Sequence, residues 1–137
     1  MIRVIIADDF PLVRRSIRAL LSKAPDVEVL GEAADGPDAV DAVKRLTPDV
    51  VVMDVSMPHL DGFQATAQIH ALALSTRVLA VSMYTDTSVV ENMLDKGARG
   101  FVPKANLGDQ LLLAIRAVHQ GAIYLSPAIA SMLGEEE

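Results

Sequence analysis

Five side chains that could bind a metal ion and a phosphate group follow short apolar segments of the sequence. They are Asp8 and Asp9 after IRVIIA, Asp54 after VVVM, Ser82 at the end of RVLAVS, and Lys104 shortly after GFV. Crowded carboxylates repel one another, so a cation between them favours their ionised form. Oxygen ligands without histidine or cysteine suit Mg²⁺, which in proteins commonly also binds phosphate oxygens. These residue types therefore indicate magnesium-dependent phosphate chemistry.

Asp54 is the candidate nucleophile of this set, because a carboxylate can take a phosphoryl group as an aspartyl phosphate. Lys104 would pair with one phosphoryl oxygen, and the hydroxyl of Ser82 would donate a hydrogen bond to another. We expect Asp61, which precedes an apolar helical pattern, to cap that helix rather than to bind metal. Asp9 could both bind metal and cap the helix that follows it.

The elements that must bring these side chains together are short strands alternating with helices. Apolar, mostly β-branched runs predict strands at 2–7, 27–33, 50–53, 77–82 and 100–102, and helical patterns lie between them. Gly97 and Gly121 mark helix ends, and 124–137 reads as a short extra helix with an acidic end. Five strand–helix units predict a doubly wound parallel sheet with helices on both faces. Sites in such sheets form beyond the carboxyl ends of the strands.

The last long helix has one apolar stripe, formed by Leu107, Leu111, Ala114, Ile115 and Val118. Leu113 lies about 200° around the helix from Leu111, at 100° per residue, so we expect it to face away from the core. An isolated exposed leucine is ordinary, and a contact in a two-fold dimer or with another domain is the alternative interpretation.

Composition narrows the class of protein. The chain has 137 residues, 51% of them hydrophobic, with no cysteine and a net charge of −6. These values predict one globular domain, exclude disulfides and thiolate metal sites, and argue against this chain binding nucleic acid by itself. The N-terminal apolar run is too short for a signal peptide, and no stretch approaches membrane-spanning length. We expect a soluble protein with no membrane contact, and its lack of cysteine is compatible with the cytoplasm.

Four segments carry a resemblance to a known family: Asp8-Asp9 after VIIA, MDVSMPHLDG, VLAVS, and GARGFVPK. In this order and spacing they resemble the receiver domain of bacterial two-component response regulators. The resemblance implies a flavodoxin-like, five-stranded sheet of order 2-1-3-4-5. It implies a receiver domain over 1–124, with 125–137 as an extension or the start of a linker. The segment AIRAVHQGAIYLSP is most similar to regulators with a LuxR-type helix-turn-helix domain, which we do not expect within this chain.

The resemblance also implies roles for individual residues. A sensor histidine kinase would transfer a phosphoryl group to Asp54, with Mg²⁺ held by Asp9, Asp54 and the backbone carbonyl of Ser56, and by Asp8 through water. Ser82 and Phe101 would switch position to control an output, expected to be transcription. Partners would be the kinase, a second copy of the chain, and nucleic acid only through a separate domain. Self-phosphorylation and slow self-dephosphorylation are expected, without turnover of a substrate.

Two positions depart from the family pattern. Ala105 follows the motif lysine where a proline with a cis bond is common, which leaves the geometry of the Lys104–Ala105 bond open. Phe101 stands where tyrosine is commoner, and the missing hydroxyl should favour an inward position even without phosphate. Ser56 and Tyr84 occupy variable positions that can tune dephosphorylation.

Three other functions compete with this one. A haloacid-dehalogenase-type phosphatase also uses an aspartate after a strand, but Asp54-Val55-Ser56 lacks the second acid of its D-x-D signature. A flavodoxin-like flavin binder shares the predicted fold, but two acids after the first strand would repel its phosphate. A receiver-like scaffold that never takes phosphate would have the same residues. His59, His70 and His119 are expected on the surface.

Overall fold

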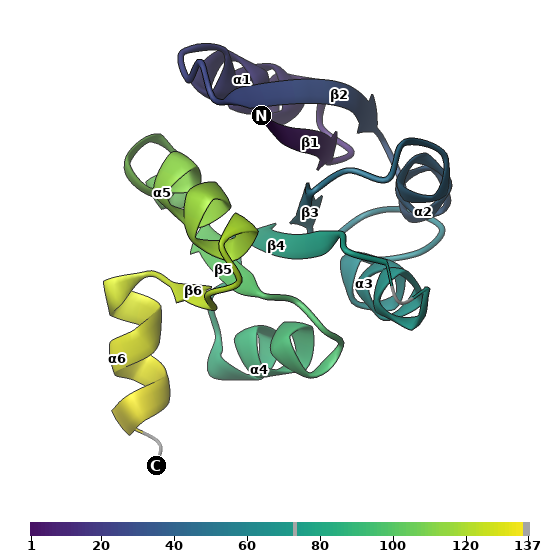
Figure 1. Ribbon diagram of the computed structural model, residues 1–137. Helices are drawn as coiled ribbons and strands as arrows, with labels where there is room; N and C mark the ends of the chain where they lie inside the picture. The colour runs from purple at the N-terminus through teal and green to yellow at the C-terminus, as the bar shows by residue number, and fades with distance from the viewer. Residues whose placement is uncertain (73, 136–137) are drawn as a thin grey trace.

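The structure is a computed structural model that describes residues 1–72 and 74–135. One parallel sheet with the strand order β2-β1-β3-β4-β5-β6 lies at its centre (Figure 1). The strands are β1 (Ile2–Ala7), β2 (Val27–Ala33), β3 (Val50–Asp54), β4 (Arg77–Ser82), β5 (Gly100–Pro103) and β6 (Tyr124–Leu125). The predicted order 2-1-3-4-5 is confirmed, and β6 adds a sixth strand of two residues beside β5.

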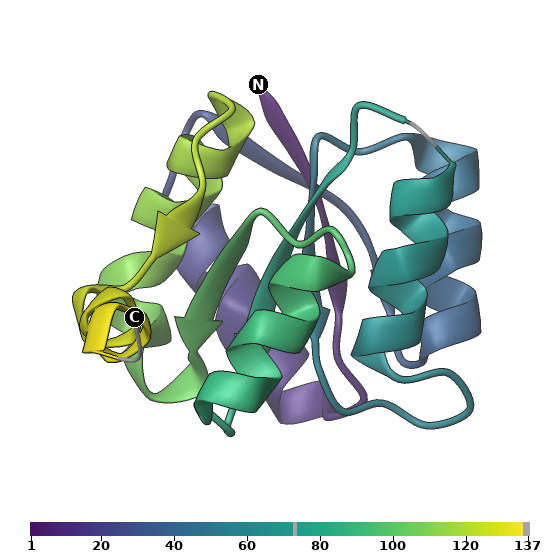
Figure 2. The same cartoon turned by 90° about the horizontal axis from the view of Figure 1, so that it is seen from below.

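Helices cover both faces of the sheet, as predicted (Figures 1 and 2). They are α1 (Pro11–Ser22), α2 (Gly36–Leu46), α3 (Gly62–Ala71), α4 (Thr87–Asp95), α5 (Leu107–His119) and α6 (Pro127–Glu135). The buried apolar residues form two clusters, one on each face. The first includes residues of α2, α3, α4 and α6, and the second includes residues of α1 and α5. Because both faces are covered, the central strands are apolar throughout rather than alternating.

Local signals account for several helix ends. The carboxylate of Asp61 accepts a hydrogen bond from the backbone N–H of Gln64 at 2.9 Å, so its predicted capping role is confirmed. Gly97 and Gly121 follow α4 and α5 with φ of 114° and 93°, a conformation that glycine adopts readily. The predicted capping role of Asp9 is wrong, since the residue before α1 is Phe10 and no side chain caps that helix.

The structure settles the geometry of the turn after β5, which the sequence left open. Lys104–Asn106 form a short 3₁₀-helix that leads directly into α5. No cis peptide bond occurs in the described parts of the chain, so the Lys104–Ala105 bond is trans. The predicted stripe of α5 faces the core, with Leu111 and Ile115 fully buried, whereas Leu113 is 58% exposed, as expected.

None of the helices in the described residues has the length and apolar character required to cross a membrane.

Candidate functional site

The register of the sheet brings the candidate residues to one edge. Ala7 pairs with Met53 across β1 and β3, so Asp8 and Asp54 are the next residues on neighbouring strands. Asp54 pairs with Val81 of β4, and Ser82 pairs with Pro103 of β5. Four neighbouring strands therefore end together, with Asp8, Asp54, Ser82 and Lys104 at or just beyond their carboxyl ends.

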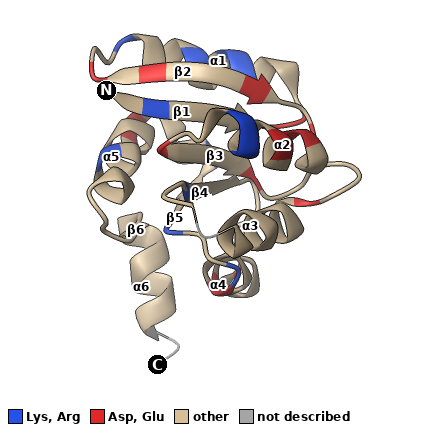
Figure 3. Cartoon of the chain, turned by 45° about the vertical axis from the view of Figure 1, so that its right-hand side comes forward, with Lys and Arg blue, Asp and Glu red and all other residues tan. Residues whose placement is uncertain are grey.

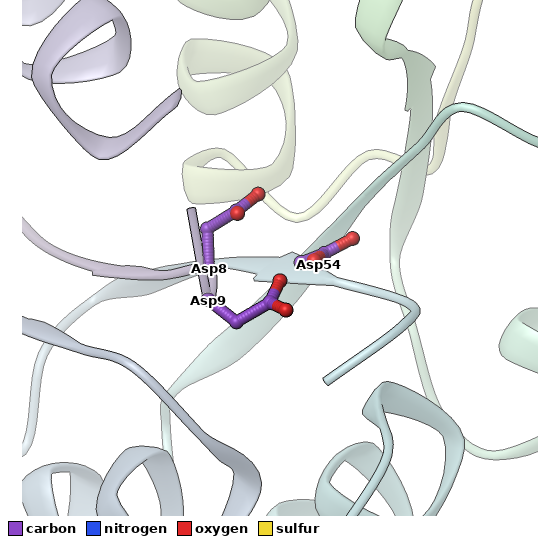
Figure 4. Close-up of side chains that lie close together, drawn as sticks. All are labelled: Asp8, Asp9 and Asp54. Atoms are coloured by element: carbon purple, nitrogen blue, oxygen red, sulfur yellow. The ribbon is translucent and has the colours of Figure 1, made fainter. Parts of the chain in front are cut away.

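Three carboxylates meet at this edge (Figure 4). Asp8, Asp9 and Asp54 each offer an oxygen atom, and these atoms all lie within 4.8 Å of one another. The side chains of Asp8 and Asp54 are buried, and Asp9 is partly exposed. The structure thus brings together the acidic cluster that the sequence indicates.

The ammonium group of Lys104 compensates part of this negative charge. Its Nζ lies 2.8 Å from Oδ2 of Asp8 and 3.2 Å from Oδ1 of Asp54, and only 12% of its side chain is exposed. Although burial lowers the pKa of the Lys104 ammonium, its close contact with Asp8 and the charges of both carboxylates outweigh burial and raise it. Lys104 therefore stays protonated and is held beside the candidate nucleophile.

One ammonium does not neutralise the whole cluster. Burial and then the charge of Asp8 raise the pKa of the Asp54 carboxyl, Lys104 partly opposes them, and the net result is a pKa of about 6. In the absence of a further cation, the ionised form of Asp54 is thus disfavoured compared with an exposed aspartate. A bound cation would relieve this cost, which makes the site suited to a metal ion.

Unpaired oxygens support the same conclusion. Oδ1 of Asp9 is buried and has no hydrogen-bond partner among the described residues. Oδ2 of Asp8 has the nearby Lys104 ammonium but no hydrogen bond of good geometry. A buried polar atom without a partner is costly unless another ligand satisfies it. These unpaired atoms are carboxylate oxygens, which are the kind of ligand that Mg²⁺ prefers.

The remaining predicted residues lie around the cluster. Oγ of Ser82 is buried and accepts a hydrogen bond from the backbone N–H of Tyr84 at 2.9 Å, so its own proton is free to be donated. The backbone N–H of Ser56 donates to Oδ1 of Asp54 at 3.3 Å. Phe101 is fully buried, which is the inward position expected for it. Its role as a switch and the role of the Ser56 carbonyl as a metal ligand stay predictions.

A small hollow opens beside Asp54. It has a volume of about 200 Å³, and its polar lining includes Asp54, Ser82 and Lys104. Exposed apolar side chains of Phe10, Met83 and Tyr84 surround it. The volume and lining suit a small charged group such as a phosphoryl group. By contrast, His59, His70 and His119 are exposed, as predicted, and none of them lines this hollow.

Sequence reasoning missed two residues at the start of α1 that contact the acidic cluster, Phe10 just before the helix and Arg14 within it. The backbone N–H of Phe10 donates to Oδ1 of Asp8 at 2.9 Å, and the Phe10 ring centre lies 6.0 Å from the Lys104 ammonium. The guanidinium of Arg14 donates to the backbone carbonyl of Asp8 at 2.5 Å and to Glu32 at 3.0 Å. Figure 3 shows basic segments (blue) of α1 beside the acidic tip (red) of β2. In the sequence, the sign that this turn had a role in the site was an apolar residue, Phe10, at a surface position.

Gly62 is a third residue whose role the sequence did not reveal. Its backbone N–H donates to the carbonyl of Val55 at 2.8 Å, which ties the start of α3 to the end of β3. A Cβ atom on Gly62 would lie 2.3 Å from the carbonyl oxygen of Asp54. Only glycine therefore permits α3 to approach the backbone of the candidate nucleophile this closely.

Comparison with known proteins places this geometry in a family. Residues 4–116 match the response regulator receiver domain family. The chain is 34% identical to the transcriptional regulatory protein DegU of Brevibacillus brevis, over 98% of this chain and 57% of DegU. It is 36% identical to the oxygen regulatory protein NreC of Staphylococcus epidermidis, over 62% of NreC. The chain thus spans about three fifths of the length of these relatives.

A solved structure agrees over nearly the whole chain. The two-component response regulator of the LuxR family from Aurantimonas sp. SI85-9A1 has a TM-score of 0.93 and 34% identity, covering 98% of this chain and 96% of that one. The family match, the parallel sheet and the acidic cluster at its edge lead to one conclusion: the chain belongs to the response regulator receiver domain family.

Proposed function

We propose that this chain is a phosphoacceptor that receives a phosphoryl group from a sensor histidine kinase on Asp54 and switches conformation in response. The observation that carries the proposal is the buried Asp54 at the end of β3, held between a lysine and two further carboxylates. We assign the receiver domain to 1–124, with 125–137 as an extension of it or the start of a linker. The output, which we expect to be transcription, would act in the cytoplasm through a separate DNA-binding domain, because this acidic chain is poorly suited to bind DNA directly.

The chain's own residues have distinct parts in the transfer. A carboxylate oxygen of Asp54 attacks the phosphorus of the kinase phosphohistidine, an O–P bond forms, and the P–N bond breaks with its electron pair left on the imidazole nitrogen. Lys104 then pairs with one phosphoryl oxygen, and the hydroxyl of Ser82 donates to another. This transfer is not turnover of a substrate, since the phosphoryl group stays attached to the chain.

The metal would be held by Asp9 and Asp54 with the carbonyl of Ser56, and by Asp8 through water. Mg²⁺, when bound, supplies positive charge that neutralises the phosphoryl oxygens. The unpaired oxygen of Asp9 and the raised pKa of Asp54 support this assignment from within the chain.

The test is incubation with Mg²⁺ and acetyl phosphate, followed by intact-mass measurement. We expect a single phosphoryl increment on Asp54, located by peptide mapping, which disappears when Mg²⁺ is chelated. Turnover of a small phosphate ester without lasting label would favour the phosphatase alternative. A protein that never acquires the label under these conditions would be the inactive scaffold, and the proposal would be wrong.

Metal affinity provides an independent prediction. Asp9→Ala should weaken Mg²⁺ binding by at least roughly tenfold, and Asp8→Ala should weaken it less, because Asp9 binds directly and Asp8 through water. Isothermal titration measures both. Asp109→Asn is the control, since it removes an exposed carboxylate of α5 that does not belong to the acidic cluster. Equal affinity in all four proteins would contradict the proposed ligand set.

A second prediction concerns self-association through α5. Leu113 is 58% exposed on the face of α5 opposite the buried stripe, and a leucine at a two-fold contact would contribute buried apolar area. We expect weak self-association that phosphorylation strengthens and that Leu113→Glu reduces, with unchanged labelling. Leu74→Glu is the control, because Leu74 is also exposed but lies between α3 and β4. Identical sedimentation of wild type and Leu113→Glu in both states would exclude this surface.

A further inference from the structure

The C-terminal segment of the chain is built into the edge of the sheet. Strand β6 pairs with β5, with Gly100 opposite Tyr124 and Phe101 opposite Leu125. Ser126 follows, buried, and its hydroxyl accepts a hydrogen bond from the backbone N–H of Ile129 at 3.4 Å. Figures 1 and 2 show that α6 then lies along this edge, near α4. The helix is therefore attached to the strand that carries Phe101 and leads to Lys104.

The surface on which α6 packs is apolar and is part of the core. Ile129 is only 3% exposed and is part of the same buried cluster as Val90, Met93 and Phe101. Met132 and Leu133 of α6 pack against this cluster from outside. Burial of these side chains is what holds a short helix in place, because an isolated helix of nine residues is unstable in water.

The packing beneath α6 is incomplete at one place. A hollow of about 350 Å³ separates α6 from the loops after β4 and β5. Ile129 and Met132 line it from the helix, and Ser82, Met83, Pro103 and Ala105 line it from the strand ends. Its walls are thus made partly by α6 and partly by the neighbours of the phosphoacceptor.

The same strand ends form walls of both hollows. Ser82 and Met83 line the hollow under α6 and also the hollow of about 200 Å³ beside Asp54. Lys104 lines the hollow beside Asp54, whereas Pro103 and Ala105 on either side of it line the hollow under α6. The ends of β4 and β5 are therefore shared walls, and a shift of these residues at Asp54 changes the hollow under α6 as well.

We infer that α6 reports the state of Asp54: it is docked in the unmodified protein and loosens when Asp54 is phosphorylated. This inference rests on the proposed phosphoacceptor function. When the hydroxyl of Ser82 and the ammonium of Lys104 are drawn toward the phosphoryl group, the wall facing Ile129 and Met132 recedes and the hollow grows. Lost contacts and a larger cavity destabilise the docked helix. The released helix would alter the position of any domain joined to it.

Hydrogen exchange measures this coupling directly. The backbone N–H of Ala130 donates to the carbonyl of Ser126 at 2.9 Å, so its exchange reports whether α6 is formed. In protein labelled by acetyl phosphate and Mg²⁺, we expect peptides of 127–133 to exchange at least about fivefold faster than in unlabelled protein. The Asp54→Asn protein under the same conditions should show no change. Labelled protein with unchanged or slower exchange overturns the inference while leaving the phosphoacceptor function standing, and absence of label overturns both.

Linkage supplies a reciprocal test, because coupling between two sites acts equally in both directions. Ile129→Ala should weaken the packing of α6 on the core. It should therefore tighten the binding of beryllium fluoride with Mg²⁺ at Asp54 by about two- to tenfold. Ile129→Val, a milder change, should give a smaller effect of the same sign. Ala130→Ser is the control, since Ala130 is exposed on the same helix. Unchanged or weaker binding in both Ile129 variants would show that α6 is not coupled to the site.

Discussion

Asp54→Asn is expected to raise the free energy of unfolding of the metal-free protein by about 1–3 kcal/mol at about pH 7.5, and to abolish phosphoryl labelling. Burial, and then the charge of Asp8, raise the pKa of the Asp54 carboxyl from 3.8 to about 6 in the folded protein. The folded state therefore binds the proton more tightly than the unfolded state. The stability that this proton contributes is present below pH 3.8 and is lost as the pH rises through about 6. An amide has no charge to bury, so the variant avoids this loss.

Urea unfolding with a chelator at several pH values measures the effect. The gain in stability from Asp54→Asn should be small near pH 4, grow through pH 6, and shrink when Mg²⁺ is added to the wild type. The control is Asp26→Asn, because the hydrogen bond from Arg116 lowers the pKa of the half-exposed Asp26 carboxyl. At pH values above the pKa of Asp26, loss of that carboxylate should slightly lower the free energy of unfolding. This is the opposite of the effect expected for Asp54→Asn. If the Asp54→Asn protein is no more stable than wild type at neutral pH, the conclusion that burial of the Asp54 charge costs stability is wrong.

The fold could be predicted because several independent features of the sequence indicate each of the main strands. Runs such as VVVM before Asp54 are β-branched, continuous and followed by polar residues, so both the strand and its buried position follow from the pattern. The convergence of Asp8, Asp54, Ser82 and Lys104 then follows from the parallel arrangement alone. The two-residue β6 has no such pattern, since its pairing with β5 depends on tertiary contact. The 3₁₀ turn at Lys104–Asn106 was missed for the same reason.

The electrostatics of the site could be predicted only in outline. Spacing shows that carboxylates crowd together, but it does not show which of them loses most contact with water. The structure buries Asp8 and Asp54 and leaves Asp9 partly exposed with one unpaired oxygen. Asp8 also accepts a hydrogen bond from the Phe10 N–H, which no side-chain pattern indicates. Backbone donors and neighbouring elements thus decide which of these carboxylates are buried and which of their oxygens have partners.

The second large effect is expected from Gly62→Ala. The added Cβ would lie 2.3 Å from the carbonyl oxygen of Asp54 and 2.7 Å from Cα of Val55, and both are backbone atoms that cannot rotate away. Either α3 must withdraw, which loses the hydrogen bond from the Gly62 N–H to Val55, or the end of β3 must shift. We expect a loss of about 3 kcal/mol or more in the free energy of unfolding. Because the clash is at Asp54 itself, Mg²⁺ affinity should fall as well.

Gly108→Ala separates this clash from the general effect of replacing glycine. Gly108 lies in the first turn of α5, and a Cβ there would meet no atom within 4 Å. Alanine loses less conformational entropy than glycine in a helix, so this variant should be more stable by about 0.5–1 kcal/mol and should bind Mg²⁺ as the wild type does. Urea unfolding and Mg²⁺ titration of the two variants give opposite results if the close approach of α3 positions Asp54. Equal stability of Gly62→Ala and wild type would mean that the end of β3 can move without cost, and that the site does not depend on this contact.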